Sequence, residues 1–308
     1  MLININDMWD KKTTAAHKAY VEQLLAERHN IIGSPILRLL VQHCCGDFAC
    51  GSPEELRKIM DAASYLCSTE TQAAVSIFHA ESAKLFNYGK FASKRTKGWN
   101  AYALCGAANY KICPYCQQSA AVTLSSTKSG KSFRPTLDHF YPKSEYPYLG
   151  LSLYNLVPSC QTCNSSLKGQ TNFAQTDHLH PYEDDEFIRF EWDFNDYVTA
   201  RQSATVLSPA KLAIDVVTPM KGHAKAQHAE NSVETFLVKE RLTFNLPSLR
   251  DFVEVLCSYS SFRTSDVNSG ALPSMPLSPE TMLQFDPMNY KNEMLGRLKK
   301  DLFEARWR

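Results

Sequence analysis

The sequence predicts an α+β protein that is mainly helical and contains a small antiparallel sheet. Two observations support this prediction. Apolar residues recur at helical spacing through residues 1–109, and short runs rich in β-forming residues follow, separated by turn residues. We therefore expect a helical N-terminal region (1–109), a compact core (110–195), and a C-terminal region (196–308) that combines a β-hairpin with helices. The C-terminal region includes a Ser-, Pro- and Gly-rich mobile loop at about 264–280.

The N-terminal helices are predicted from periodicity and from capping residues. Residues 13–29 carry apolar side chains at helical intervals, and residues 36–43 form a shorter apolar stretch. Ser52 precedes Pro53 and two acidic residues, which is the pattern of a helix N-terminus, and this helix should run to about residue 67. Residues 69–87 again show helical spacing. The first region should therefore be a group of helices.

Two Cys-x-x-Cys pairs, Cys113/Cys116 and Cys160/Cys163, indicate a metal centre. Two thiolates separated by two residues can reach the same ion, and two such pairs supply the four ligands of a closed, structural zinc site. The other cysteines are scattered, and Cys44 and Cys45 are adjacent, which suits disulfides poorly. We therefore expect a reducing, cytoplasmic environment.

Between the cysteine pairs the sequence places polar residues that suit catalysis. Residues 117–136 predict a β-hairpin around a Gly-containing turn, and its second strand leads into Asp138 and His139. Neighbours on a strand point to opposite faces, so the carboxylate can hold a hard cation while the imidazole faces a water. Asn164 directly follows the last cysteine at the start of a short helix that Gly169 ends. Asn155 lies on the intervening loop.

These residues resemble the HNH endonuclease family, whose core is a ββα-metal finger. The resemblance rests on Asp138-His139, on Asn155-Leu156, and on Cys160-Gln-Thr-Cys163-Asn164 with Lys168, and it covers about 60 residues. It implies a central, zinc-stabilised ββα-metal finger. Its third named position is Asn164 in place of His, as in HNN variants of the family.

The resemblance also implies residue roles. His139 would be the general base, Asp138 and Asn164 would bind the catalytic Mg²⁺ or Mn²⁺, and Asn155 would orient the loop that carries His139. The structural zinc would be held by Cys113, Cys116, Cys160 and Cys163.

Basic residues near the predicted site are candidates for contacts with nucleic acid. They are Lys131, Arg134, Lys143 and Lys168 in and beside the finger, and Lys94 and Arg95 in the basic segment 90–98. Aromatic residues, among them Trp99, follow that segment, and a basic patch with aromatics can grip a nucleic-acid strand. The alternative interpretation is that residues 90–98 form a solvent-exposed helix end. The net charge of only +1 means that any binding surface must be local.

Beyond the finger the sequence predicts further strands and helices. Asp177, His178 and His180 could bind a metal, although a loop packed on the finger is the simpler interpretation. We expect strands at residues 187–193, 204–207 and 212–217, which should extend the finger's sheet. We expect helices at residues 230–242, at residues 246–258, and from about Met288 to the C-terminus.

The predicted function is that of a metal-dependent nuclease that cuts DNA, or RNA such as tRNA. The helical surroundings resemble the HNH subunit of Septu-type and retron-linked antiphage defence systems. That resemblance implies a partner ATPase of the ABC/SMC type and a possible complex with a retron reverse transcriptase and its msDNA. The alternative is a non-catalytic zinc module that binds nucleic acid or protein. No run of 18 apolar residues and no signal peptide is found, so we expect no membrane contact.

Overall fold

The computed structural model describes residues 1–28, 32–125, 130–193, 197, 199, 214–258 and 278–307. The expected strand at 204–207 and most of the expected loop at 264–280 lie outside these residues. The chain forms two compact units, which are described separately. The N-terminal unit comprises Asn4–Pro114 and Ala120–Asp184, and the C-terminal unit comprises Met1–Ile3, Tyr115–Ser119 and Asp185–Arg308.

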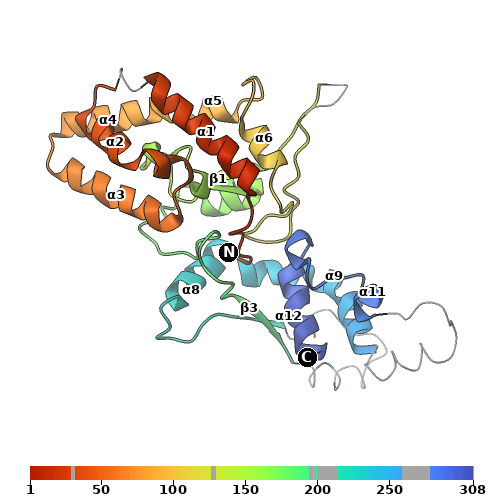
Figure 1. Ribbon diagram of the computed structural model, residues 1–308. Helices are drawn as coiled ribbons and strands as arrows, with labels where there is room; N and C mark the ends of the chain where they lie inside the picture. The colour runs from red at the N-terminus through yellow and green to blue at the C-terminus, as the bar shows by residue number, and fades with distance from the viewer. Residues whose placement is uncertain are drawn as a thin grey trace. The chain divides into compact units, whose positions relative to one another are not determined.

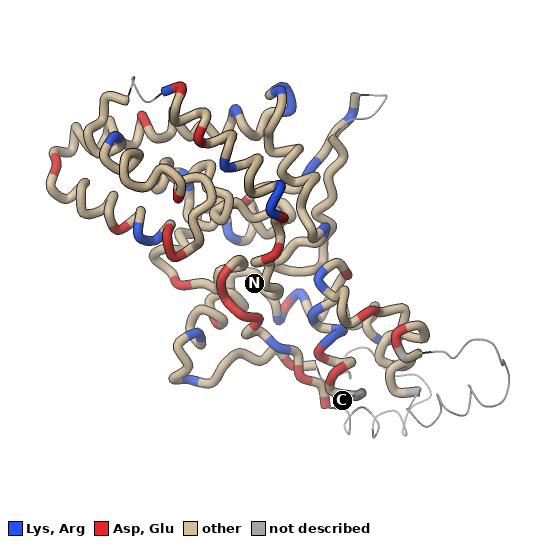
Figure 2. The backbone as a smooth tube through the Cα atoms, in the orientation of Figure 1, with Lys and Arg blue, Asp and Glu red and all other residues tan. Residues whose placement is uncertain are grey.

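The described elements confirm a mainly helical α+β protein with small antiparallel sheets (Figure 1). Figure 2 shows Lys and Arg as well as Asp and Glu at many places along the described backbone. The helices of the N-terminal unit are α1 (Lys11–Arg28), α2 (Pro35–Cys50), α3 (Pro53–Ser68), α4 (Gln72–Leu85), α5 (Tyr88–Ala92) and α6 (Ala101–Gly106).

Capping residues set where these helices begin. Ser52 forms a capping box at the start of α3: its hydroxyl accepts from the backbone N–H of Glu55, and the Glu55 carboxylate accepts from the backbone N–H of Ser52. Ser34 and Thr71 cap α2 and α4 in the simpler way. Helix α2 then packs against α1, α3 and α4.

This helical layer holds the loop that precedes the second strand. Two short 3₁₀ helices, η2 (Pro147–Leu149) and η3 (Leu153–Asn155), contact α4 and α2 respectively. The ring of Tyr148 stacks on Phe78 with 5.4 Å between centroids. The hydroxyl of Ser152 donates to the backbone carbonyl of Phe48 at 2.8 Å. The loop is therefore fixed by buried contacts to the helices.

Strands β1 (Thr136–His139) and β2 (Leu156–Ser159) pair antiparallel, with Asp138 opposite Val157 and His139 opposite Leu156. The expected short helix follows as η4 (Thr162–Lys168), which has π geometry. The backbone N–H of Gly169 closes this helix on the carbonyl of Asn164 at 3.0 Å, and Gly169 has a φ of 53°. A positive φ suits glycine, so this position ends the helix as the sequence predicted.

The regular hairpin that was expected at residues 117–136 does not form among the described residues. Within the described part of this segment, Leu124 and Phe133 form an isolated antiparallel bridge, and Ala120 bridges to Ile112 instead. The strand that carries Asp138 takes its partner from residues 156–159. Pairing across the chain therefore outweighs the local turn pattern.

In the C-terminal unit, β3 (Arg189–Trp192) pairs with β4 (Ile214–Val217) in a sheet of its own. The expectation that these strands extend the finger's sheet is therefore wrong. Helix α12 (Gly296–Trp307) packs on β3. The carboxylate of Asp301 on α12 accepts from the backbone N–H of Phe190 at 2.9 Å and from Arg297 at 2.8 Å. These buried polar contacts join β3 to the last helix.

The remaining helices differ from the expected ones in their ends. They are α8 (Ala226–Thr235), α9 (Val238–Ser258), α11 (Pro279–Leu283) and the 3₁₀ helix η6 (Tyr290–Asn292). Leu237 has a φ of 49°, and this left-handed residue splits the helix expected at 230–242. Helix α9 then runs through Pro247, where a separate helix was expected. The final helix begins at Gly296, later than the expected Met288.

Candidate functional site

The four cysteines of the two Cys-x-x-Cys pairs lie together. The sulfur atoms of Cys113, Cys116, Cys160 and Cys163 all lie within 4.8 Å of one another, and all four side chains are buried. Backbone N–H groups of Gln118 and Cys163 donate to the sulfurs of Cys116 and Cys160, each at 3.4 Å. Such N–H···S bonds stabilise thiolates.

The chemistry of this donor set fits zinc. Tetrahedral zinc with Zn–S bonds of about 2.3 Å places its sulfurs roughly 3.8 Å apart, which the observed cluster can accommodate. Four protein ligands leave no open position, so the site could hold a structural ion. By contrast, burial raises the pKa of the isolated Cys105 to about 12, so that residue remains a thiol at neutral pH.

Strand β1 delivers Asp138 and His139 to one end of the β1–β2 pair. The carboxylate of Asp138 accepts from Nζ of Lys168 at 2.8 Å, and both side chains are nearly inaccessible, at 4% and 2% exposed. The Lys168 ammonium also donates to the backbone carbonyl of His139 and lies 4.8 Å from the ring centroid of Phe173. Burial lowers the pKa of Lys168, while the neighbouring carboxylate opposes that shift. The pair is therefore a buried link between β1 and η4.

His139 is buried and neutral at physiological pH. Desolvation lowers its pKa to about 3; the hydrogen bond to Gly150 opposes this shift, and the charges of Lys143 and Lys168 add to it. Its Nε2 lies 3.0 Å from the carbonyl oxygen of Gly150. A carbonyl can only accept, so Nε2 carries the proton and Nδ1 carries the lone pair. The tautomer therefore leaves Nδ1 as a proton acceptor.

The ring of Tyr88 fixes the orientation of His139 from the other side. The two rings meet edge to face with 4.5 Å between centroids. No sequence pattern pointed to Tyr88, because its role depends on where α5 lies relative to β1. Gly150, whose carbonyl oxygen lies near Nε2 of His139, was also missed, because this contact too depends on the folded chain.

Asn155 is completely buried and holds the loop between the strands. Its Oδ1 accepts from the backbone N–H of Tyr141 at 2.7 Å, and its Nδ2 donates to the carbonyls of Tyr141 and Leu149, each at 3.1 Å. The backbone N–H of Phe140, next to His139, donates to the carbonyl of Asn155 at 3.0 Å. All of these contacts lie within two residues of His139 or Gly150.

Three of the four predicted catalytic residues, Asp138, His139 and Asn164, line one cavity of about 530 Å³, whereas the buried Asn155 does not line it. Asp138 and His139 reach it from β1, and Asn164 reaches it from the first turn of η4. Asp138, His139 and Asn164 thus line the same cavity. Three of the predicted basic residues also line this cavity, namely Arg134, Lys143 and Lys168.

The basic candidates occupy different environments. Lys143 is exposed, and its ammonium lies 5.7 Å from the ring centroid of Tyr88. Arg134 is half-buried and donates to the carbonyls of Pro135 and Ala92. Lys131, Lys94 and Arg95 are exposed and do not line this cavity. Lys168 is buried against Asp138 in the wall of the cavity. Its ammonium would therefore attract a phosphate without contacting it directly.

Residues 177–180 form a packed loop. The ring of His178 stacks on Phe173 with 3.8 Å between centroids, and its Nδ1 contacts the carbonyl of Thr176 at 2.6 Å. Over the residues that the structure describes, the four-cysteine cluster is the one group of His, Cys, Asp and Glu found with the geometry to hold an ion. In that part of the chain no helix is long and apolar enough to cross a membrane.

Comparison with curated proteins finds a distant relative, the Ea31 protein of Escherichia phage lambda. It is 29% identical to this chain over 188 residues. The match covers 59% of this chain and 59% of Ea31, so the chain spans less than two thirds of that relative. No protein-family model matches the chain. No solved structure matches it.

Proposed function

We propose that this protein is a metal-dependent HNH endonuclease that hydrolyses phosphodiester bonds in nucleic acid. The observation that carries the proposal is the shared cavity of Asp138, His139 and Asn164. Phosphodiester hydrolysis needs a base for water, charge relief at the phosphate and support for the leaving oxygen. A carboxylate, a neutral imidazole and an amide in one cavity supply groups for these tasks.

The order of the elements supports the proposal. Strand β1, strand β2 and helix η4 follow one another, and the two cysteine pairs lie before and after the strands. This is the arrangement that a ββα-metal finger requires. The zinc cluster would hold the start of η4, and thus Asn164, near the end of β1.

The donors in the cavity suit a hard divalent cation. The side-chain oxygens of Asp138 and Asn164 are the type of ligand that Mg²⁺ and Mn²⁺ prefer, and two protein ligands leave positions for water and substrate. Asp138 would share its carboxylate between the ion and the Lys168 ammonium. A bound ion would supply positive charge that stabilises the negative charge developing on the phosphate.

Each residue would then have a separate role. His139 would accept a proton from the attacking water at Nδ1, because Nε2 is committed to Gly150. The negative charge of the substrate phosphate would oppose the lowering of the His139 pKa by burial. Asn155 keeps the loop in place through its bonds to Tyr141 and Leu149. Lys143 and Arg134 line the cavity and would neutralise neighbouring phosphates of a bound strand.

A cleavage assay on three substrates tests this proposal. Plasmid, single-stranded DNA and tRNA are incubated with the protein in Mg²⁺ or Mn²⁺, with EDTA as the metal-free control. Cleavage of at least one substrate should require metal and should be lost in His139→Ala. His43→Ala is the matched control, because His43 is exposed and lies outside the cavity. Because an HNH site needs no 2′-hydroxyl, the substrate arms also decide between DNA and RNA.

The biological setting that we propose is antiphage defence. The sequence resemblance to Septu-type and retron-linked HNH subunits supports it. A nuclease that could cut the nucleic acid of its own host must be restrained, and an ABC/SMC-type ATPase or a retron complex with its msDNA would serve. Co-purification from the native gene neighbourhood tests this partnership. Isolation of the chain without any ATPase or reverse transcriptase would argue against it.

One observation favours the alternative of a non-catalytic zinc module. The Asp138 carboxylate already has a cationic partner in Lys168, as it would in a purely structural ion pair. Such a module would bind nucleic acid or protein and would keep its four cysteines. It would show no metal-dependent cleavage of any of the three substrates, so the same assay separates the two functions.

A further inference from the structure

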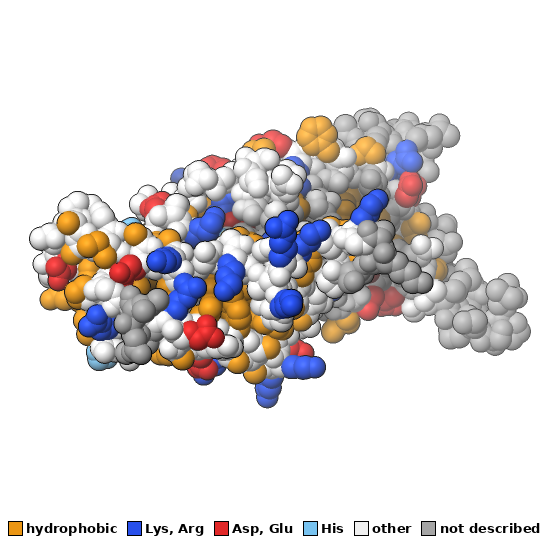
Figure 3. Space-filling view, turned by 90° about the horizontal axis from the view of Figure 1, so that it is seen from above, with side chains coloured by type: hydrophobic (Ala, Val, Ile, Leu, Met, Phe, Trp, Pro, Cys, Tyr) orange, Lys and Arg blue, Asp and Glu red, His pale blue; other side chains and the backbone are white. Residues whose placement is uncertain are grey.

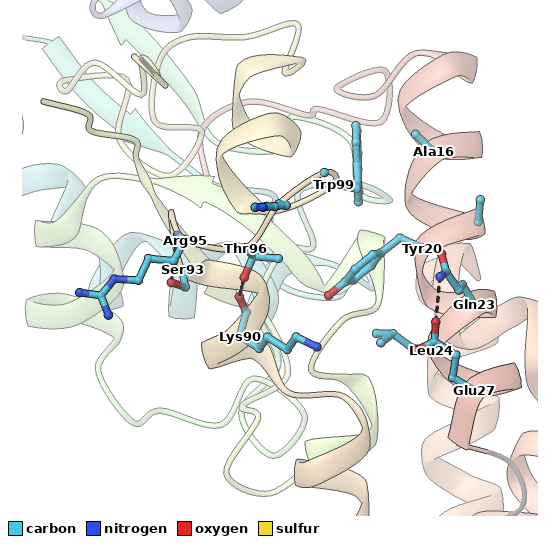
Figure 4. A pocket seen from close by; sticks show the side chains of 13 residues that line it. Ala16, Tyr20, Gln23, Leu24, Glu27, Lys90, Ser93, Arg95, Thr96 and Trp99 are labelled. Atoms are coloured by element: carbon cyan, nitrogen blue, oxygen red, sulfur yellow. Dashed lines mark hydrogen bonds between the residues drawn. The ribbon is translucent and has the colours of Figure 1, made fainter. Parts of the chain in front are cut away.

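A second cavity in the N-terminal unit lies between helix α1 and residues 90–99. Its volume is about 820 Å³, which falls within the range of roughly 300–1,000 Å³ typical of sites for small molecules. Figure 4 shows Tyr20, Gln23 and Glu27 of α1 on one side, with Lys90, Thr96 and Trp99 facing them. The cavity is separate from the one lined by His139, since the two share no lining residue.

Aromatic rings in this cavity are held in fixed orientations. The indole N–H of Trp99 donates to Nδ1 of His17 at 3.1 Å. Nε2 of His17 contacts the carbonyl oxygen of Leu151 at 2.7 Å, so His17 itself is anchored. Tyr20 packs against Phe91 with 5.5 Å between ring centroids. Trp99 and Tyr20 are each partly exposed and therefore offer ring surface to a ligand.

The charge of the cavity favours an anion. Three lining residues are cationic (Lys90, Arg95 and Lys97) and one is anionic (Glu27), which gives 3 − 1 = +2. The three basic side chains are exposed. Glu27 accepts from the amide of Gln23 at 2.8 Å, which partly satisfies its charge. In Figure 4 the Lys90 side chain extends toward α1, whereas the Arg95 guanidinium points away from it.

The loop that carries these cations is built by its own hydrogen bonds. Asn100 donates from Nδ2 to the carbonyl of Thr96 at 2.6 Å, and the backbone N–H of Thr96 donates to Ser93 at 3.2 Å. Gly98 has a φ of 77°, a conformation that glycine adopts without strain. The turn before Trp99 is therefore preorganised, and a ligand need not order it.

Helix α5 links this cavity to the proposed catalytic one. Tyr88, at its start, lines the cavity of His139, and Lys90, two residues later, lines the second cavity. Arg134 lines the first cavity, and its guanidinium donates to the carbonyl of Ala92 at the end of the same helix. Basic groups thus extend from one cavity to the other. Figure 3 shows several Lys and Arg side chains on the face that it views.

We propose that the second cavity binds an unpaired nucleotide of a single-stranded nucleic acid. Its base would stack on Trp99, and its phosphates would lie against Lys90 and Lys97. Stacking on an aromatic ring beside a basic groove is how proteins hold single strands without sequence preference. In a duplex the faces of the bases are covered by their neighbours, so the cavity should discriminate against paired strands. The strand would continue over α5 to the cavity of His139, and this last step rests on the proposed nuclease function.

Fluorescence anisotropy measures the binding without cleavage. The full chain carrying His139→Ala is titrated with a labelled 12-nucleotide single-stranded DNA, with the same sequence as RNA, and with the matching duplex. Single strands should bind at least ~10-fold more tightly than the duplex. Competition with AMP distinguishes a free nucleotide from a strand as the natural ligand. Displacement of the strand by AMP at micromolar concentration would identify a nucleotide site, whereas no displacement would identify a strand site.

Three variants locate the binding. Trp99→Leu should weaken single-strand binding by ~10-fold, because it removes the stacking surface. Lys97→Ala should weaken it and should make the salt dependence shallower by about 0.7 in log–log slope, as the loss of one phosphate contact on a single strand predicts. Lys12→Ala is the matched control, because Lys12 is exposed on α1 and lines neither cavity. Thermal melting checks the fold of Trp99→Leu, which leaves His17 without its donor.

Equal effects of Lys97→Ala and Lys12→Ala, or duplex binding as tight as single-strand binding, would overturn this inference. Failure of this binding site and failure of the proposed nuclease activity can be told apart. A protein that binds single strands through Trp99 but cuts none of the three substrates would retain the binding site and lose the proposed activity. A protein that cuts but binds unchanged in the Trp99→Leu and Lys97→Ala variants would retain the activity and lose this site.

Discussion

Nζ of Lys168 lies 2.8 Å from Oδ1 of Asp138, and the two side chains are only 2% and 4% exposed. This contact joins the end of helix η4 to strand β1, 30 residues earlier in the chain. It also places a fixed positive charge beside the carboxylate that we propose as a metal ligand. The structure of the site and its electrostatics therefore depend on the same pair.

Replacing Lys168 by Met should strongly destabilise the fold. The substitution leaves the Asp138 carboxylate buried without its cationic partner, and breaking a buried pair in this way typically costs about 3–5 kcal/mol. Urea denaturation measures the free energy of unfolding. Lys143→Met is the control, since Lys143 is exposed beside the same cavity. A loss no greater than that of the control would show that the buried pair does not stabilise the protein.

Replacing Cys113 by Ser should remove zinc and unfold the region around it. Apparent zinc-binding free energies in small fingers are about 10–16 kcal/mol, so the loss of one thiolate weakens folding directly. Metal analysis of the purified protein and thermal melting should show that zinc content and stability fall together. Cys67→Ser is the matched control, because Cys67 lies outside the cluster. Full zinc occupancy in Cys113→Ser would refute the ligand assignment.

Asn155→Ala should destabilise the protein by about 2–5 kcal/mol, since three backbone groups lose a buried partner. Asn155→Asp is the informative companion. It keeps the acceptor for the Tyr141 N–H but places a carboxylate oxygen against the carbonyls of Tyr141 and Leu149. We expect Asp to be no better than Ala in urea denaturation. If Asp were as stable as the original Asn, the donor bonds from Nδ2 would be of no consequence.

His17 should make the protein less stable in acid. Burial lowers its pKa to about 4, although the hydrogen bond to Leu151 opposes the shift. An unfolded His titrates near about 6.5, so between these values the unfolded state binds the extra proton. The contribution of His17 is therefore complete above the unfolded pKa and falls by about 1.4 kcal/mol per pH unit as the pH drops toward 4.

Urea denaturation across this pH range, with His17→Gln as the comparison, isolates the effect. Gln does not titrate and can still donate to the carbonyl of Leu151. The difference in unfolding free energy between the two proteins should shrink as the pH falls. A difference that stays constant from pH 7 to pH 4 would mean that His17 does not resist protonation in the folded state.

Local patterns predicted the parts of the fold that local chemistry determines. The capping box of Ser52 and Glu55 needs only neighbouring residues, and the spacing within each cysteine pair suits two ligands of one ion. The predicted end of η4 at Gly169 is of the same kind. In each case the interacting groups lie within a few residues or obey a fixed ligand geometry.

Contacts between distant segments could not be predicted in this way. The pairing of β3 with β4, separate from the β1–β2 sheet, depends on which edges meet in three dimensions. The helix breaks at Leu237, which adopts a left-handed conformation although it is not a glycine, so the sequence gives no sign of the break. At the site, the sequence indicated Asp138 and Lys168 as separate candidates. Only the folded chain shows them as one buried pair.

Single-turnover cleavage by wild type and site variants tests the central claim most directly. The claim is that Asp138, His139 and Asn164 act together on one phosphodiester. In matched Mg²⁺ or Mn²⁺, His139→Ala should be slower by about 10²–10⁴-fold while it remains folded at the assay temperature, as thermal melting checks. Adding Asn164→Ala to His139→Ala should cost less than the product of the two single effects, as residues of one catalytic unit do. Cleavage by His139→Ala at the wild-type rate would contradict the account.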